Sequence, residues 1–461
     1  MSTMRLEWAS TSVAVIVLFF ITNFHPVRAQ DLSNPLATTL TPTQIREDLE
    51  FLRDEWIHAD RSFSSRDRRR FESIIDAAIV AAGEISPAEF ALEAARAVAV
   101  SGNGHTNVDL YAFAHLIRFL PIRVWWFSDG LYVVESHPDL ADLLGRRIVN
   151  IGSHSAEDAL DLITPFISGT EEHVRYLSPG YLVSLESLLH AGVIQSSDEV
   201  PLTVEFPSGE QHAVTLRPQA EGRSAPPGGY GIPIPSPLDD PDRWPHVLDG
   251  VPDRSPAFRA PTVDVDYEWM KDDRVLYIRS NQVFSSDDDR LDHKLLGLVV
   301  EQIVPRRSKF VIVDLRLNTG GDLTNTILFS QMLPELVPAD GRVFVLVGNV
   351  TYSAALVTAA MLKGNGGDKV KLIGETMGDG PRFWAEGLAI PLPNSRIPIA
   401  PATGYHDWAN GCAGVDGCYW AAEVFAIPGV SLEPDIVVPT AFQDYAAGRD
   451  TVLETALALA K

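Results

Sequence analysis

The second half of the chain alternates short apolar runs with stretches of helical periodicity, and this alternation restricts the possible folds most. Residues 275–278, 310–315 and 343–347 are apolar runs of strand length, and residues 295–304 show helical spacing between the first two. Continuous apolar runs separated by helices are typical of parallel strands that are covered on both faces. The sequence therefore predicts an α/β domain, which we place at residues 263–445.

Two glycines and one serine follow predicted strands of this domain. Gly320 and Gly321 follow the apolar run at residues 310–315 after a short polar turn. Paired glycines allow backbone amides to approach a ligand. Ser353 stands where a strand gives way to a predicted helix, so the amide of Ala354 and the helix dipole lie beside its hydroxyl. A nucleophilic serine needs such a setting, although an ordinary helix N-cap is the alternative role at this junction.

The N-terminal region is predicted to be helical. Residues 41–44 and 86–89 each combine a capping side chain, proline at the first helical position and Gln or Glu at the third. A further apolar series at helical spacing runs over residues 71–79. We therefore place a helical unit at residues 30–110.

The middle of the chain changes to the period of strands. Residues 119–134 alternate around a hairpin turn at Asp129-Gly130. The order of glycine turn, strand, short turn and helix over residues 144–163 resembles the latter half of a PDZ domain, a peptide-binding module. These features define a PDZ-like β/α region at residues 111–217. Prolines are concentrated in residues 218–262, which predicts a linker or long surface loop, and residues 446–461 are expected to form a C-terminal helix.

The N-terminus reads as a secretory signal. An apolar run at residues 13–21 follows Arg5 and precedes Val27-Arg28-Ala29, which favours cleavage after Ala29 and a signal peptide over residues 1–29. An uncleaved anchor is the alternative, but nine apolar residues are short for a hydrocarbon core of about 30 Å. We therefore expect an exported protein, periplasmic or extracellular, with no stable membrane insertion after cleavage.

Composition limits the partners and cofactors. Lys and Arg total 37 against 61 Asp and Glu, a formal net charge of −24, so binding to nucleic acid is not expected. Two cysteines cannot build a multi-cysteine metal cluster, and neither a metal nor an organic cofactor is implied. In an oxidising compartment, Cys412 and Cys418 are expected to form a disulfide.

The order of motifs in the second half is similar to the core pattern of the tail-specific, C-terminal-processing serine peptidases. The pattern runs strand-Asp-Leu-Arg-x-Asn-x-Gly-Gly, then strand-x-Tyr-Ser-Ala-Ala, then Leu-Ile-Gly-Glu-Thr at residues 372–376. Leu-Pro-Asn-Ser at 392–395 and Glu-Pro-Asp-Ile-Val-Val at 433–438 also resemble family segments. The resemblance implies a crotonase-like, ClpP-type catalytic core and acyl transfer at Ser353. It also implies an oxyanion hole of backbone amides, for which we nominate Gly320 or Gly321 with Ala354, and a peptide or unfolded protein as substrate.

The family contains two kinds of catalytic base. Processing peptidases use a lysine in a Gly-Lys-Gly context, but this chain has Asp379 at that place, and we expect Asp379 only to shape its loop. Lys363, Lys369 and Lys371 lie nearby in sequence and are expected to be solvated. His105, in Gly-His-Thr, is similar to a segment of the tricorn-like branch, and an imidazole suits a general base at neutral pH. A turn histidine bonded to backbone is the alternative.

The acid that would orient His105 is less clearly marked. The resemblance favours Glu423, with Glu375 as the second choice. For each of them, an ordinary surface glutamate without a catalytic role is an equally good interpretation. The sequence thus predicts a secreted serine-type peptidase. The alternative is a non-catalytic peptide- or lipophile-binding protein of the same fold, like the interphotoreceptor retinoid-binding proteins, because fold alone does not fix function.

Overall fold

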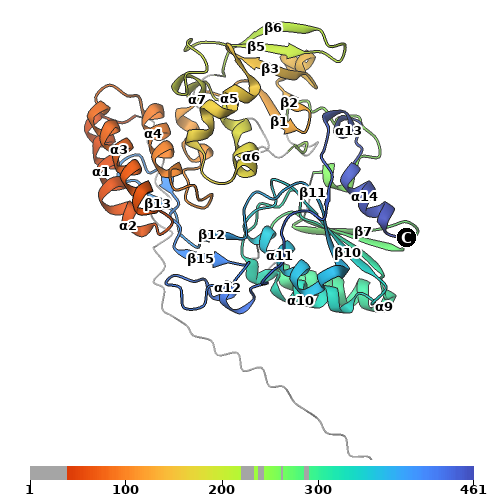
Figure 1. Ribbon diagram of the computed structural model, residues 1–461. Coiled ribbons are helices and arrows are strands. Elements are labelled where there is room, and N and C mark those ends of the chain that lie inside the picture. Colours follow the sequence, from red (N-terminus) through yellow and green to blue (C-terminus); the bar gives the residue numbers. More distant parts are fainter. Residues whose placement is uncertain (1–38, 220–232, 237–242, 261–262, 285–289) are drawn as a thin grey trace, which may run out of the picture. The chain divides into compact units, whose positions relative to one another are not determined.

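The C-terminal half is built on a six-stranded sheet with strand order β16-β11-β10-β9-β8-β7, in which β7 alone is antiparallel to its neighbour (Figure 1). Its strands are β7 Val265–Met270, β8 Val275–Ser280, β9 Phe310–Asp314, β10 Arg342–Val347, β11 Val370–Gly374 and β16 Ile436–Val437. The computed structural model describes residues 39–219, 233–236, 243–260, 263–284 and 290–461, and residues 36–461 form one compact unit. The expected signal peptide therefore lies outside the described residues, and the expected linker lies only partly within them.

Both faces of this sheet are covered, which explains its continuous apolar strands. Alternate residues of one strand enter different cores: Val311 and Val313 of β9 pack with the helical side, whereas Ile312 packs against the C-terminal helix. The helices on this half are α8 Leu291–Leu298, α9 Val304–Arg306, α10 Ile327–Leu336, α11 Ala354–Gly366, α12 Trp420–Val424, α13 Phe442–Ala446 and α14 Thr451–Leu459. The mixed α/β class predicted from the sequence is confirmed.

The N-terminal region is helical as predicted. Its helices are α1 Pro42–Phe51, α2 Ile57–Ala59, α3 Ser65–Ala81 and α4 Pro87–Ala99, with a π-helical turn over Leu52–Trp56. Both predicted capping boxes are present, at Thr41 with Gln44 and at Ser86 with Glu89. Local sequence therefore determines where these helices begin.

A second, antiparallel sheet occupies the middle of the chain. Its order is β1-β2-β3-β5-β6, with β4 paired to β3. The strands are β1 Ile122–Phe127, β2 Gly130–Ser136, β3 Arg147–Ile151, β4 His154–Ser155, β5 Val200–Glu205 and β6 Gln211–Leu216, and the helices are α5 Ala156–Ile163, α6 Glu171–Leu182 and α7 Leu185–His190. The predicted hairpin at Asp129-Gly130 is confirmed, because β1 and β2 pair directly across it.

A segment that we call the strap, residues 382–407, connects the two halves. It contains β12 Arg382–Ala385, β13 Ile390–Pro391, β14 Pro398–Ile399 and β15 Gly404–Asp407, which pair as β12 with β15 and β13 with β14. Leu392, Ile397 and Ile399 of the strap belong to the hydrophobic core of the N-terminal half. The buried carboxylate of Asp48 in α1 accepts from the backbone amide of Ser395 at 2.8 Å. The strap therefore holds the N-terminal helices to the domain that carries Ser353.

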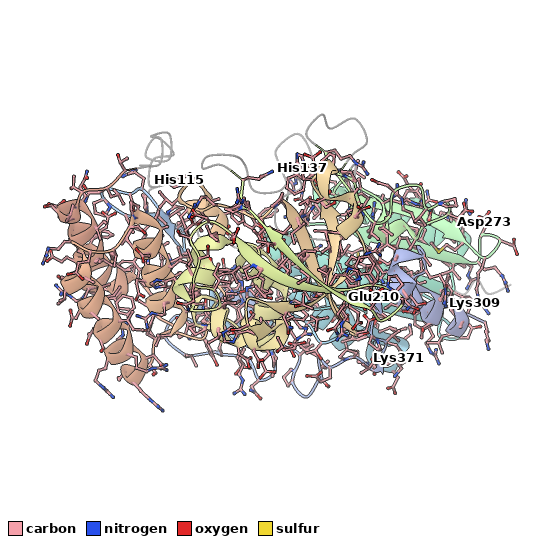
Figure 2. The ribbon with its side chains drawn as sticks, turned by 90° about the horizontal axis from the view of Figure 1, so that it is seen from above. His115, His137, Glu210, Asp273, Lys309 and Lys371 are labelled. Atoms are coloured by element: carbon pink, nitrogen blue, oxygen red, sulfur yellow. A yellow bond between two sulfur atoms is a disulfide. The ribbon has the colours of Figure 1, made fainter. Side chains whose placement is uncertain are left out.

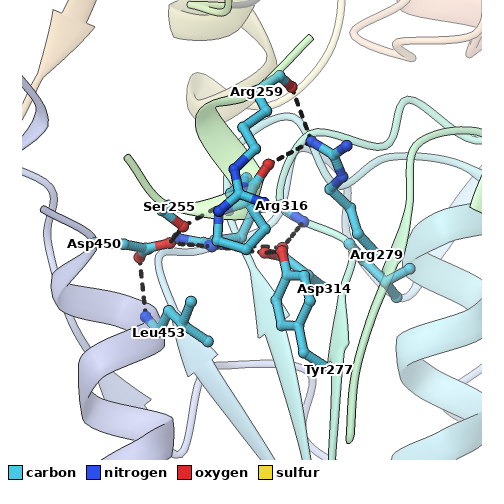
Figure 3. A network of polar contacts seen from close by, with 12 residues as sticks. Ser255, Arg259, Tyr277, Arg279, Asp314, Arg316, Asp450 and Leu453 are labelled. Atoms are coloured by element: carbon cyan, nitrogen blue, oxygen red, sulfur yellow. Dashed lines mark hydrogen bonds and ion pairs between the residues drawn. The ribbon is translucent and has the colours of Figure 1, made fainter. Parts of the chain in front are cut away.

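A buried ion network ties α14 to the end of β9 (Figure 3). The Arg316 guanidinium donates to Asp314 at 2.6 Å and to Asp450 at 2.7 Å, and the Tyr277 hydroxyl donates to Asp314 at 2.8 Å. Ser255 donates to Asp450 at 2.7 Å, so Asp450, which also caps α14, joins three parts of the chain. The flanking carboxylates hold the pKa of Arg316 above its usual range despite burial. The Asp-Leu-Arg part of the sequence motif is therefore structural.

The predicted disulfide is confirmed, since Cys412 and Cys418 are bonded to each other. It closes a short loop between β15 and α12. Among the described residues, no helix has the length and apolar character needed to cross a membrane.

Candidate active site

Ser353 occupies a strained turn between β10 and α11. Its backbone has φ +53° and ψ −125°, a region that residues with a side chain rarely adopt. It stands at the N-cap position, yet among the described residues its side chain makes no capping hydrogen bond. The ordinary N-cap role therefore does not explain this serine, and its hydroxyl is left available at a helix N-terminus.

The Gly320-Gly321 turn packs directly against Ser353. A Cβ atom placed on Gly320 would lie 2.7 Å from Ser353 Cβ and 2.9 Å from the amide nitrogen of Ala354. The Gly320 amide donates to Asn318 Oδ1 at 2.9 Å, while Asn318 is anchored to the Ser280 carbonyl at 3.0 Å. Among the described residues, no acceptor is found for the amides of Gly321 and Ala354. Of the amides nominated from sequence, these two are therefore free for an oxyanion.

The structure brings His105 to the residue next to Ser353. The imidazole stacks on the Tyr352 ring with centroids 4.6 Å apart, and His105 Nδ1 lies 2.8 Å from the Tyr352 hydroxyl oxygen. On its other side the ring stacks on Phe383 at 5.1 Å. In the described part of the chain, neither His105 Nε2 nor the Ser353 hydroxyl has a hydrogen-bond partner, and the two are not bonded to each other. Catalytic hydrogen bonds are often formed only once substrate is bound.

The turn that carries His105 is held by the strap. Asn103 donates to the Trp384 carbonyl and accepts from the Trp384 amide, both at 3.0 Å. Asn107 and Ala400 exchange backbone hydrogen bonds of 3.3 and 3.1 Å. Sequence reasoning missed this anchoring, because Asn103 and Trp384 are far apart in the chain and no local pattern links them.

Burial determines the protonation of the histidine. Desolvation, together with repulsion from His173 and His406, lowers the pKa of His105 to about 3. The side chain is 16% exposed, and at neutral pH the imidazole is uncharged, while the same low pKa makes it a weaker proton acceptor than a solvated imidazole.

Asp379 lies beside His105, a contact that the sequence did not predict. Its Oδ2 atom is 3.6 Å from His105 Nδ1, and its side chain is only 9% exposed. Burial raises the pKa of Asp379 to about 7. A carboxylate that is costly to ionise therefore faces the ring of the candidate base.

Neither predicted glutamate reaches His105. Glu423 is exposed on α12, because that helix buries Ala421 and Ala422 and so turns the next residue outward. Glu375 instead lines a separate cavity of about 300 Å³ beyond the ends of β9, β10 and β11, where burial raises its pKa. Glu423 was the first choice for the acid partner of His105 and Glu375 the second. In this structure neither side chain contacts the imidazole.

The three neighbouring lysines are engaged away from Ser353. Lys363 donates to Asp435 at 2.6 Å, and Lys371, labelled in Figure 2, lies 3.7 Å from the same carboxylate. Lys369 donates to carbonyl oxygens at the end of α10. These contacts account for the lysines without a catalytic role. Among the described residues, no group of His, Cys, Asp and Glu side chains could hold a metal ion.

A cavity of about 330 Å³ opens beside His105 and Tyr352. Its lining is mainly apolar and includes Leu110, Phe166, Ile167, Leu177 and Tyr181. A space of this size and character can hold a large apolar side chain.

The arrangement of the two sheets, the helices and the strap defines a mixed α/β fold that occurs in known structures. No protein-family model and no curated protein sequence matches the chain. Among solved structures, the chain is similar to mature CPAF in complex with lactacystin, with 13% identity and a TM-score of 0.55, covering 91% of this chain and 98% of that one. A crystal structure of mature CPAF alone gives 14% identity and the same TM-score, with 91% and 97% coverage.

Weaker similarity extends to one named processing protease. The photosystem II D1 C-terminal processing protease is 12% identical, with a TM-score of 0.38 and coverage of 88% of this chain and 98% of that one. At these identities, what the comparison establishes is the fold shared with CPAF.

Proposed function

We propose that the protein is a secreted serine-type peptidase that cleaves peptide bonds through an acyl-enzyme on Ser353. The observation that carries the proposal is the strained, uncapped Ser353 packed on the Gly320-Gly321 turn, with His105 stacked on the adjacent residue. We also propose that the C-terminal core is crotonase-like, that residues 111–217 form a PDZ-like peptide-binding region, and that the chain is exported.

The mechanism follows from the protonation states and the free amides. Neutral His105 accepts the Ser353 proton through Nε2 as the serine oxygen attacks a peptide carbonyl. The amides of Gly321 and Ala354 donate to the oxyanion that forms, and the N-terminus of α11 adds its dipole. The imidazolium then gives its proton to the leaving amine, and a water activated by the same ring releases the acyl group.

The cavity beside His105 suggests the side chain preferred in the substrate. Its apolar lining favours peptides with a large apolar residue near the cleaved bond. Asp109 and Glu386 are the acidic residues among those that line the cavity.

Labelling with a fluorophosphonate tests the proposal. We expect one adduct per chain, located on Ser353 by peptide mass spectrometry, and none in Ser353→Ala. Because removing an uncapped hydroxyl costs little stability, Ser353→Ala should fold like the natural chain and lose turnover of a peptide library. His105→Gln should lower the labelling rate at least about a hundredfold, as expected for loss of a general base.

A folded protein that takes no label and cleaves no peptide would favour the non-catalytic binding function instead. The strained serine would then be unexplained. Binding of peptides or lipophilic molecules without turnover would be the positive sign of that alternative.

A further inference from the structure

Asp379 stands where the processing peptidases carry their lysine, and in the structure it lies beside His105. Its Oδ2 atom lies 3.6 Å from His105 Nδ1 and, among the described residues, is buried without a hydrogen bond. Its other oxygen, Oδ1, accepts from the Gly380 amide at 2.8 Å, which fixes the carboxyl plane. One acceptor atom is therefore unfilled and faces a ring nitrogen.

The loop that carries Asp379 is attached to the segment that carries the serine. The Gly378 amide donates to the Thr351 carbonyl at 3.0 Å, and the Thr170 hydroxyl donates to the Gly378 carbonyl at 3.0 Å. A Cβ on Gly378 would lie 2.4 Å from the Asn349 carbonyl oxygen, so the loop packs closely on the residues before Ser353. The position of Asp379 is thus set by the same backbone that positions the nucleophile.

The position of the imidazole proton decides whether His105 can act as base. A neutral imidazole carries one proton, and Nε2 can accept only if that proton is on Nδ1. The Tyr352 hydroxyl at Nδ1 does not decide this, because a hydroxyl can either donate or accept. An ionised carboxylate can only accept, so it selects the tautomer with the proton on Nδ1.

We propose that Asp379 is the positioning acid of the peptidase, holding His105 in the tautomer whose Nε2 is free to take the Ser353 proton. The inference rests on the peptidase function proposed above. In that role Asp379 takes the place of Glu423 and Glu375. The position that holds the lysine in processing peptidases would then hold the positioning acid of a different catalytic arrangement. Asp379 acts through His105 and not on the substrate.

The pH response follows from the groups around the pair. His105 is faced by Tyr352, by His173 of α6 and by Asp379, with His406 of β15 behind Phe383. His173 is also buried, and its pKa is lowered to about 4. Asp379, which lies against the ring, has a pKa raised to about 7 by burial, so its charge changes near neutrality. Activity should fall as pH drops through about 7, because protonated Asp379 no longer selects the productive tautomer.

The experiment measures the rate of Ser353 labelling by a fluorophosphonate from pH 5 to 9, together with kcat and KM on a cleaved peptide. Asp379→Asn should lower kcat and the labelling rate at least tenfold at pH 8, leave KM within about twofold, and remove the fall near pH 7. Asp379→Glu should restore part of the rate and the pH dependence. Asp368→Asn removes one negative charge from an exposed position on the turn after α11 and should behave like the natural protein.

A second readout does not depend on activity. Nitrogen-15 NMR of histidine-labelled protein reports which ring nitrogen carries the proton, and His105→Gln identifies the signal of His105. We expect the proton on Nδ1 at pH 8, and a shift toward Nε2 both in Asp379→Asn and in the natural protein at pH 5.5.

The two proposals fail in different ways. If the natural protein takes no label at any pH, the peptidase function is wrong, and the NMR spectra still decide whether Asp379 controls His105. If labelling occurs but Asp379→Asn keeps the natural rate and pH profile, or the tautomer of His105 is the same in both, the role of Asp379 is overturned. Should Asp379→Asn not fold, a pH-independent His105 tautomer between pH 5.5 and 8 in the natural protein overturns it equally.

Discussion

Replacing Gly320 with alanine should both destabilise the protein and disable the candidate nucleophile. The added Cβ would meet Ser353 Cβ at 2.7 Å, the Tyr352 carbonyl oxygen at 2.8 Å and the Ala354 nitrogen at 2.9 Å. All three distances are shorter than a carbon atom tolerates, and two of the atoms are backbone. The φ of +103° at Gly320 adds a conformational cost for any residue with a side chain.

The magnitude has two parts. A non-glycine residue in a sparsely populated region costs on the order of 1–3 kcal/mol. Overpacking a tight site costs on the order of a further 1–3 kcal/mol. We therefore expect Gly320→Ala to lower the free energy of unfolding by about 2–6 kcal/mol. Because a displacement of about 1 Å at a reacting group can cost a hundredfold in rate, Ser353 labelling should fall by about that factor.

The assay compares urea unfolding midpoints and fluorophosphonate labelling rates with those of Gly209→Ala. Gly209 has φ +84° but nothing within 4 Å of an added Cβ, so that variant carries the backbone cost without the clash. It should lose about 1–3 kcal/mol and keep the natural labelling rate. If Gly320→Ala matches Gly209→Ala in stability and labels at the natural rate, the close packing of the glycine turn on Ser353 does not exist as described.

Further predictions concern the ion network, the buried His246, the cavity and the disulfide. Arg316→Met leaves two buried carboxylates uncompensated and should cost about 3–5 kcal/mol in urea unfolding; a loss below 1 kcal/mol would contradict it. Burial lowers the pKa of His246 to about 3, so as pH falls below 6.5 the unfolded chain binds a proton that the folded protein does not, and stability is lost. His246→Asn should therefore reduce the slope of the unfolding free energy against pH between pH 4 and 6 by up to about 1.4 kcal/mol per pH unit. An unchanged slope would refute this. Leu177→Phe fills part of the cavity beside His105 and should shift cleavage from large to small apolar residues in a peptide library; unchanged preference would separate the cavity from specificity. Denatured, non-reduced protein should show no free thiol from Cys412 and Cys418, and two titratable thiols would disprove the bridge.

Local patterns predicted the elements well. The capping motifs at Thr41 and Ser86 placed two helices, and the apolar runs placed the strands of the parallel sheet, because these signals depend on neighbours in the chain. The placement of Ser353 directly before a helix was likewise readable, since a strand, a polar turn and an Ala-rich stretch follow one another. What the sequence could not give was the strained backbone of Ser353, because its φ depends on packing against a distant glycine turn.

The partners of His105 show where sequence reasoning ended. The proximity of His105 to Ser353 came from a family resemblance, and no periodicity in the chain implied it. The choice of Glu423 followed spacing along the chain, whereas the ring nitrogen meets Asp379 through a loop tethered to Thr351. Asp379 was visible as the residue in the lysine's place, but only its distance from His105 suggests a function for it.

The motif that led to the site turns out to connect its chemistry to the rest of the fold. Asp314 and Arg316 bind α14 through Asp450, and two residues later Asn318 holds the Gly320 amide and leaves that of Gly321 free. The side chains of Asp314, Arg316 and Asn318 thus fix the strand end that leads to the proposed oxyanion donor. Loss of Arg316 should accordingly disturb the position of Ser353 as well as lower the free energy of unfolding, because the same strand end carries both the buried ion pair and the glycine turn.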